Sequence, residues 1–301
     1  MRTAFINQLI VEARANPRLF VAVGDLGYAV VEPFAAEFPD RFLNVGVAEQ
    51  NMTGIAAGLA SEGYHVFTYS IANFPTLRCL EQIRNDICYH GLPVTVVAVG
   101  AGLAYGNQGY SHHAVQDIAV MRTLPGLRLL SPADPGEAVE AVSYLSANPG
   151  PSYLRLGKAG EKNLYEAGPL TPLPALVLEG SRDVAIAATG SILSLALEAA
   201  AAQIAAGKVP PTVFSMPWIH PAGEGMVKAF KSFKHLICLE EHIPQGGLRE
   251  MLAGLLPRSV HVSGLALPPE AMVVVGSQSF LRESAGLTVS RLLSLINKHQ
   301  E

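Results

Sequence analysis

The chain has 301 residues, of which 50% are hydrophobic and 15% are charged, so it can bury a core large enough for about two domains. Its formal net charge of -4, with no basic cluster, argues against nucleic acids and anionic membranes as partners. The odd number of cysteines (Cys79, Cys88 and Cys238), with no Cys-x-x-Cys pair, indicates reduced thiols and a cytoplasmic protein.

In the first half, short β-branched runs alternate with longer helical patterns, which is typical of a parallel α/β sheet. The fully apolar run 94–99 is typical of a strand that is covered on both faces. The predicted strands are 19–23, 42–45, 66–69, 94–99, 128–130 and 152–156. The predicted helices are 3–15, 50–61, 75–90, 114–124 and 135–147.

A segment rich in glycine and proline follows at about 160–180, and a second alternation begins at Asp183. Its predicted strands are 184–188, 211–215, 235–239 and 271–275, and its predicted helices are 191–206, 223–230 and 246–256. Residues 189–191 (Thr-Gly-Ser) break the longest apolar stretch, so no membrane span is expected. The sequence therefore predicts two consecutive α/β domains, 1–165 and 183–301, each a mostly parallel sheet covered by helices, with a linker at 166–182.

A carboxylate stands at the start of a helix made of small and apolar residues. The strand 42–45 stops at Gly46, and Glu49 precedes a helix that we expect to be buried on every side. A glutamate is rarely buried without a partner. The residues alone leave two roles open for Glu49, a capping carboxylate at the favourable end of the helix dipole or a functional group.

Asp25 and the segment 100–113 are two further candidates for a functional site. Asp25 follows strand 19–23, which puts it at the edge where open α/β sheets bind ligands, although an Asp that caps a turn is an equal alternative. The glycines after strand 94–99 are not followed at once by a helix, so a dinucleotide site is rejected. The adjacent His112 and His113 lack a third ligand at usable spacing, so no metal site is predicted.

The stretch 44–52 (Asn-Val-Gly-Val-Ala-Glu-Gln-Asn-Met) closely resembles the glutamate motif of the transketolase-like thiamine diphosphate enzymes. The resemblance spans the whole chain, because 188–191 (Ala-Thr-Gly-Ser) and 238–242 (Cys-Leu-Glu-Glu-His) resemble the family's C-terminal domain. It implies a pyrimidine-binding domain followed by a transketolase C-terminal-type domain. In this family the glutamate hydrogen-bonds a ring nitrogen of the cofactor's aminopyrimidine, which implies the same role for Glu49.

The resemblance also assigns the walls of the cofactor slot and the catalytic histidine. Phe74 falls at the position of an aromatic ring that stacks on the pyrimidine, and Ile71 falls where a second aromatic is common. Asp25 matches an acid near the cofactor and the subunit interface. His112 aligns with a histidine that hydrogen-bonds substrate oxygens and can pass protons during carbon–carbon bond cleavage.

At the substrate end the chain departs from the family pattern. Gln108 stands where transketolases commonly have an Asp that reads a sugar hydroxyl. Arg2 matches a phosphate-binding Arg, and Lys158 takes the place of another Arg, so it would attract an anion without the bidentate fork. Ala29 and Gly100 replace a Ser and a His. Whether the sugar or sugar-phosphate substrate carries a phosphate is therefore left open.

The chain contains no Gly-Asp-Gly, the motif that holds the diphosphate and its divalent metal in this group of enzymes. The resemblance therefore implies the C-terminal half of a split transketolase. An N-terminal subunit would carry the Gly-Asp-Gly motif and Mg²⁺, in a heterotetramer with two copies of each chain.

The function expected from the resemblance is transfer of a two-carbon ketol unit from a ketose donor to an aldehyde acceptor. Two alternatives share the cofactor and the split layout: a deoxyxylulose-phosphate-synthase-like condensation and the β subunit of a 2-oxoacid dehydrogenase. A non-catalytic binding or regulatory partner is an alternative of another class, and the presence of Glu49 argues against it.

Overall fold

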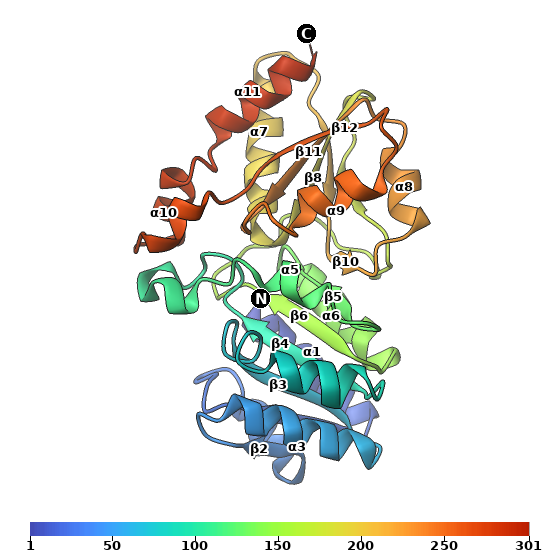
Figure 1. Cartoon of the computed structure of the whole chain (residues 1–301), viewed down its shortest axis with the longest axis vertical. Coiled ribbons are helices and arrows are strands. Elements are labelled where there is room, and N and C mark those ends of the chain that lie inside the picture. Colours follow the sequence, from blue (N-terminus) through green and yellow to red (C-terminus); the bar gives the residue numbers. More distant parts are fainter. Residues whose placement is uncertain (301) are drawn as a thin grey trace.

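The computed structural model describes residues 1–300 and shows two α/β domains, one above the other along the long axis (Figure 1). The first domain is built on a seven-stranded sheet in the order β10-β5-β6-β4-β3-β1-β2. Its parallel strands are β1 (Leu19–Val23), β2 (Phe42–Asn44), β3 (His65–Ile71), β4 (Val94–Val99), β5 (Arg128–Leu130) and β6 (Ser152–Leu156). The central strands are buried because helices cover both faces, as the apolar run of β4 predicts.

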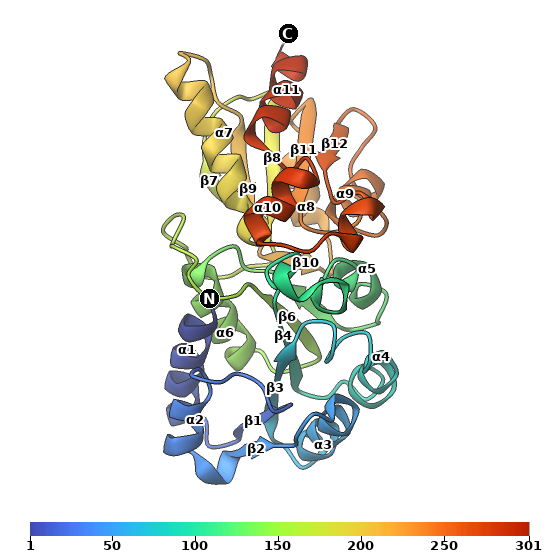
Figure 2. The same cartoon turned by 90° about the vertical axis from the view of Figure 1, so that its left-hand side faces the viewer.

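Helices lie on both sides of this sheet (Figure 2). One face is covered by α1 (Arg2–Ala15) and α6 (Pro135–Ala147), which pack against each other. The other is covered by α3 (Glu49–Ser61) and by α4 (Leu80–Gln82), which continues as the π-helical turn Ile83–Cys88. The short helices α2 (Glu32–Glu37) and α5 (Asp117–Met121) lie in connections between strands.

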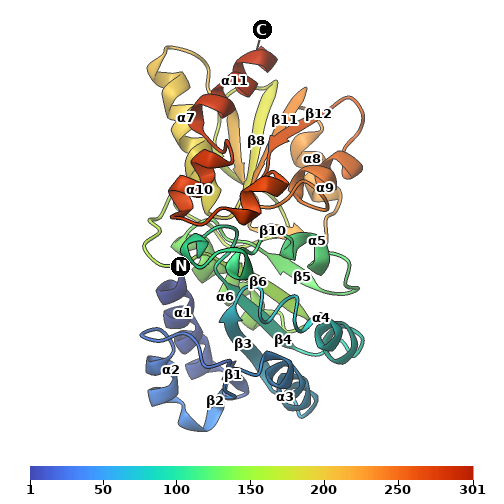
Figure 3. The same cartoon turned by 60° about the vertical axis from the view of Figure 1, so that its left-hand side comes forward.

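The second domain has a five-stranded sheet in the order β12-β11-β8-β9-β7. Its strands are β7 (Ala175–Leu178), β8 (Val184–Thr189), β9 (Thr212–Ser215), β11 (His235–Glu240) and β12 (His261–Leu265), and only the edge strand β7 runs antiparallel. Helices α7 (Leu193–Ala205) and α11 (Val289–Gln300) pack on one face and α9 (Leu248–Leu255) on the other (Figure 3). Two shorter helices are α8 (Glu224–Phe230) and α10 (Gln278–Ser284).

One strand from the second half of the chain belongs to the first sheet. Strand β10 (Trp218–His220) pairs antiparallel with β5, with Trp218 opposite Leu130 and His220 opposite Leu129. The amide of Ser131 donates to the carbonyl of Pro217 at 2.7 Å, which extends this pairing. The chain therefore returns to complete the first sheet after it has begun the second.

The predicted fold class is confirmed, and the predicted strands that lie in buried apolar runs agree with the structure to within two residues at each end. Strand β7 lies inside the segment 166–182 that we expected to link the domains, where it pairs with β9. The predicted helix 114–124 is shorter, because α5 spans only Asp117–Met121. The structure also contains α2, α10 and α11, which were not expected from the sequence pattern.

The strand predicted at 271–275 is wrong. Residues Pro269–Val273 form a 3₁₀ turn, and the edge beside β11 is occupied by β12. Val273 and Val275 are 83% and 57% exposed, so the apolar run is not part of a sheet.

Within residues 1–300, none of the helices combines the length and the apolar character that a membrane crossing requires.

Candidate active site

Glu49 begins α3 and its side chain is 0% exposed. The carboxylate lies at the carboxyl edge of the first sheet, beside Gly24 at the end of β1 and Ser70 in β3. Ser70 Oγ donates to Oε1 at 3.2 Å, and Arg78 Nη1 donates to Oε2 at 2.6 Å. The positive end of the helix dipole also favours a negative charge at this position. Glu49 is thus a buried carboxylate with polar partners on both oxygens.

Phe74 lies in the turn that follows β3 and is connected to this carboxylate through Arg78. The guanidinium carbon of Arg78 lies 4.8 Å from the centre of the Phe74 ring. A planar group that donates a hydrogen bond to Glu49 and lies against Phe74 is therefore already accommodated here. An aminopyrimidine ring is likewise planar, and a nitrogen at its edge would have to meet the same carboxylate. The residues present fit such a ring.

The turn after β1 carries two unusual backbone conformations. Asp25 and Ala29 both have positive φ, 54° and 60°, although neither is a glycine. The side chain of Asn44 holds this turn: its Nδ2 donates to Asp25 Oδ1 at 2.9 Å, and its Oδ1 accepts from the amide of Asp25 at 3.1 Å. Left-handed backbone at such residues costs about 1 kcal/mol or more each, and such strain clusters at functional sites.

His112 lies on the segment 100–114, which we name the His112 loop. Its ring makes a T-shaped contact with the Phe74 ring, with a centroid distance of 5.2 Å and an interplanar angle of 74°. Asn73 Nδ2 donates to the carbonyls on both sides of the histidine, to Ser111 at 3.1 Å and to His113 at 2.9 Å. Burial and the neighbouring His113 lower the pKa of His112, which favours the neutral imidazole at neutral pH.

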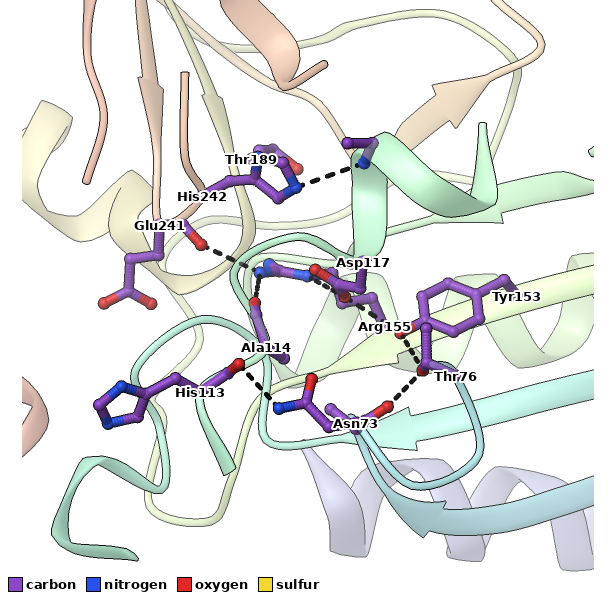
Figure 4. A network of polar contacts seen from close by, with 12 residues as sticks. Asn73, Thr76, His113, Ala114, Asp117, Tyr153, Arg155, Thr189, Glu241 and His242 are labelled. Carbon is purple, nitrogen blue, oxygen red and sulfur yellow. Dashed lines mark hydrogen bonds and ion pairs between the residues drawn. The ribbon is translucent and has the colours of Figure 1, made fainter. Parts of the chain in front are cut away.

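A buried polar network contacts the end of this loop (Figure 4). Arg155 in β6 is 1% exposed, and its Nε donates to Asp117 Oδ2 at 2.8 Å. Its Nη2 donates to the carbonyl of Ala114 at 2.8 Å and to that of Glu241 at 3.1 Å. Tyr153 also donates to Asp117, at 3.0 Å. The network ties the end of the His112 loop to both domains.

The second domain holds the other end of the loop. Any side chain at Gly102 would collide with Glu241, and any side chain at Gly106 would collide with Leu281 of α10. Glu241 is 3% exposed and accepts from Arg282 Nε at 2.6 Å and from Gln278 Nε2 at 2.9 Å. In Figure 1 the green turns of the loop lie directly beneath α10, in agreement with these contacts. Glu241, whose carboxylate is held by Arg282, is therefore part of the surface against which the loop packs.

A cavity of about 180 Å³ lies beside the loop. Its wall includes Arg2, Tyr69, Ile71 and Tyr105, with the backbone around Gly27. Two buried donors lack a hydrogen-bond partner within the described part of the chain, Arg2 Nε and the Tyr69 hydroxyl. These donors suit a ligand that brings acceptor oxygens.

Tyr105 fills the space that a side chain at position 100 would need. Gly100 has a φ of 101°, and a Cβ on it would collide with the Tyr105 ring. The Lys158 ammonium lies 5.5 Å from the centre of the same ring. The centre of the His112 ring lies 6.4 Å from the centre of the Tyr105 ring. Tyr105 is therefore close both to the histidine and to the ammonium group of Lys158.

The structure brings together most of the residues expected from the sequence. Phe74 links Glu49, through Arg78, to His112, and Ile71 lines the cavity that contains Arg2. Lys158 reaches this group through Tyr105 and through its carbonyl, which accepts from the amide of Arg2 at 3.4 Å. Asp25 lies one residue from Gly24, which contacts Glu49, but its own side chain is directed to Asn44. Gln108 is exposed on the His112 loop.

Helix α3 is not buried on every side, as we had expected. Its residues Met52, Thr53 and Ala56 are buried, whereas Gly54 and Gly58 are exposed, and a Cβ on either would meet no atom within 4 Å. Sequence reasoning also missed Arg78, Asn73 and Tyr105. The only signal in the sequence was their closeness to Phe74 and Gly100. In the described residues no group of three His, Cys, Asp or Glu side chains could hold a metal ion.

Comparison with known proteins gives matches along most of the chain. Residues 1–160 match the transketolase pyrimidine binding domain, and residues 174–292 match the transketolase C-terminal domain. The chain is 31% identical over 274 residues to an apulose-4-phosphate transketolase subunit of Actinobacillus succinogenes, covering 89% of this chain and 87% of that protein. It is 34% identical over 263 residues to 1-deoxy-D-xylulose-5-phosphate synthase 1 of Geobacter sulfurreducens, covering 84% of this chain and 40% of that protein.

A solved structure described as a split gene transketolase, inactive beta4 tetramer, is similar to this chain with a TM-score of 0.85 and 32% sequence identity. The similarity covers 99% of this chain and 97% of that one.

Proposed function

The chain belongs to the transketolase family, and we propose that it is the C-terminal subunit of a split, thiamine diphosphate-dependent transketolase. The reaction is transfer of a two-carbon ketol unit from a ketose donor to an aldehyde acceptor. Similarity to a transketolase subunit over 87% of that protein's length supports this assignment. Similarity to a split-gene transketolase over 97% of its chain supports it too.

One observation carries the proposal. The fully buried Glu49 carboxylate accepts a hydrogen bond from a planar group, the guanidinium of Arg78, which also lies against the ring of Phe74. Thiamine diphosphate would supply a nucleophilic carbon on its thiazolium ring. Glu49 would hold a proton between its carboxylate and a ring nitrogen of the aminopyrimidine, in a site where burial strengthens that hydrogen bond. Phe74 would supply the stacking face, and Ile71 an apolar edge.

His112 is placed to handle substrate protons. Its Nδ1 lies 2.9 Å from Ser111 Oγ, which leaves Nε2 for a substrate oxygen. A neutral imidazole can accept a proton from a hydroxyl and return it later, and the lowered pKa of His112 favours that neutral form. Gln108, exposed on the same loop, would contact the sugar chain of the substrate.

The cavity lined by Arg2, Tyr69, Ile71 and Tyr105 would bind the end of the sugar substrate that does not react. Arg2 and Lys158 bring positive charge, and the unpaired Arg2 Nε and Tyr69 hydroxyl are donors without acceptors. An oxygen-rich or anionic group would satisfy both donors.

A partner chain would complete the site. We infer that an N-terminal subunit with a Gly-Asp-Gly motif holds the diphosphate and Mg²⁺, since this chain has no such motif. Exposed side chains near Glu49 and Phe74 in sequence suit a covered surface, with Val47 at 73% and Leu77 at 43%. The open side of α3 at Gly54 and Gly58 would allow close approach of another chain. Two copies of each subunit in a cytoplasmic heterotetramer complete the proposal.

The test is a calorimetric titration of thiamine diphosphate and Mg²⁺ into the chain alone and into an equimolar mixture with its N-terminal partner. Binding in the mixture alone is expected, because only the mixture has both halves of the site. Glu37→Gln, which changes an exposed carboxylate far from Glu49 in the fold, is a matched control for Glu49→Gln. Tight binding by the chain alone would contradict the split site.

A second candidate reaction is supported by the similarity to a 1-deoxy-D-xylulose-5-phosphate synthase, of which the chain covers 40%. That reaction predicts CO₂ release when the assembled enzyme is given pyruvate and an aldehyde. Ketol transfer from a ketose without CO₂ release favours the transketolase reaction.

A further inference from the structure

Arg78 makes both of the contacts that a bound aminopyrimidine would need. Its Nη1 donates to Glu49 Oε2 at 2.6 Å, and its guanidinium carbon lies 4.8 Å from the centre of the Phe74 ring. The other oxygen of Glu49 is engaged by Ser70 Oγ at 3.2 Å. A ring that stacks on Phe74 and hydrogen-bonds Oε2 of Glu49 would need the space where the Arg78 guanidinium lies.

The side chain of Arg78 is free to leave this position. It is 45% exposed, whereas the carboxylate that it pairs with is 0% exposed. Arg78 lies in the turn before α4, so its stem is not locked into a helix that crosses the sheet. Arginine is always charged, and a side chain that is already 45% exposed can turn its guanidinium into solvent without burying that charge.

We propose that Arg78 is a residue of the cofactor site whose guanidinium exchanges with the aminopyrimidine and so sets the affinity for the cofactor. In the pair, Arg78 neutralises a buried carboxylate and covers the face of Phe74. On binding, the guanidinium turns outward, and Glu49 and Phe74 receive the ring in its place. This inference rests on the proposed function, because it needs thiamine diphosphate to be the ligand of Glu49.

Only molecules in which Arg78 is already turned outward can bind the cofactor. The apparent affinity for the cofactor is therefore the intrinsic affinity multiplied by the fraction of such molecules. A charge-assisted hydrogen bond to a buried acceptor, discounted for the exposure of Arg78, corresponds to a factor of about ten in that fraction. Removing the guanidinium should therefore tighten cofactor binding about tenfold. A residue that merely contacts the cofactor would weaken binding when it is removed, so the sign of the change separates the two roles.

The experiment compares the wild-type chain, Arg78→Met and the control Arg84→Met, each assembled with the N-terminal partner and titrated with thiamine diphosphate and Mg²⁺. Arg84 lies six residues further along, and its Nη1 bonds only to the neighbouring Asn85 side chain at 2.7 Å among the bonds described. Arg78→Met should bind about tenfold more tightly than wild type, and Arg84→Met should bind as wild type does. Equal or weaker binding by Arg78→Met would overturn the exchange while leaving the proposed function intact. Absence of binding in all three would overturn both.

A second measurement needs no cofactor. Thermal unfolding of the chain alone is compared for wild type, Arg78→Met, Glu49→Gln and the double variant. Arg78→Met should lower Tm, because it leaves the buried Glu49 carboxylate with Ser70 alone, and the double variant should recover part of that loss. Strictly additive Tm changes would mean that the two side chains do not depend on each other, which would overturn the pairing on which the exchange is built.

Discussion

The Glu49 region and the His112 loop are held in different ways. Glu49, Ser70 and Phe74 come from α3, β3 and the turn after it, all within the first domain. The His112 loop has only short 3₁₀ turns of its own and is held by Asn73, by Arg155 and by the second domain. The first region is therefore set by regular elements, whereas the second depends on side chains from several places.

The two regions should therefore respond differently to substitution. A substitution of Glu49 that keeps the size of the side chain should affect chemistry with little effect on folding, because the strands and α3 keep their own packing. A substitution in the supports of the His112 loop should move the histidine without touching it.

Glu49→Gln is expected to lower the kcat of the assembled enzyme about a thousandfold, because an amide cannot exchange a proton with the cofactor ring. The Tm of the chain should change by only a few degrees, since the side chain keeps its size. Steady-state kinetics and thermal unfolding check the two halves of this expectation. Full activity in the variant would remove Glu49 from the mechanism.

Arg282→Ala is expected to destabilise the chain by about 3 kcal/mol, because it leaves the buried carboxylate of Glu241 without its cation. Hydrogen exchange should accelerate in the His112 loop and remain slow in β3 and α3. Lys234→Ala is the control, since it removes an ion pair with Asp183 that is exposed in the same domain. Equal exchange in wild type and variant would mean that the second domain does not support the loop.

His65 lies outside both the Glu49 region and the His112 loop, and its titration should make the stability of the chain depend on pH. Burial, and to a lesser degree the charge of Arg128, lowers the pKa of His65 to about 4, so the folded chain keeps this imidazole neutral. The unfolded chain binds a proton near pH 6.5, so the stabilisation is complete above that pH and is lost as the pH falls toward 4. At pH 5 the loss is about 2 kcal/mol. Urea unfolding of wild type and His65→Phe at pH 7 and pH 5 measures it, and an identical pH dependence in both would contradict the assignment.

Asn73→Leu is expected to have the smallest effect on stability and a selective effect on turnover. It removes the hydrogen bonds to the carbonyls that flank His112, which should lower kcat about tenfold through misplacement of the imidazole. Cofactor affinity should remain at the wild-type value, because Phe74 and Glu49 keep their positions. Asn85→Leu is a nearby control. A changed cofactor affinity with normal kcat would show that Asn73 supports the Glu49 region and not the His112 loop.

The contrast also explains what could be predicted from the sequence. The Glu49 motif is a continuous string next to a recognisable strand and helix, and Phe74 follows at short range. Arg78 has no such signature, because an arginine before an amphipathic segment is usually a solvated surface charge. Its role emerges only when the turn after β3 brings it back over the carboxylate.

Other features depend on contacts that are distant in the sequence. Tyr105 matters because Gly100 adopts a positive φ and leaves room for its ring. Glu241 reaches the His112 loop from the second domain, where Arg282 holds its carboxylate. The wrongly predicted strand at 271–275 has the same origin: the place beside β11 is taken by β12, and Pro269–Val273 form a 3₁₀ turn instead of pairing with a strand.

Strand β10 decides how this polypeptide can be divided. It lies in the second half of the chain but closes the first sheet beside β5. A protein cut in the linker and expressed as two pieces would leave β5 with a row of unpaired backbone groups, an open edge that invites aggregation with other molecules. Any truncation, circular permutation or domain exchange must therefore carry residues 218–220 along with the first domain.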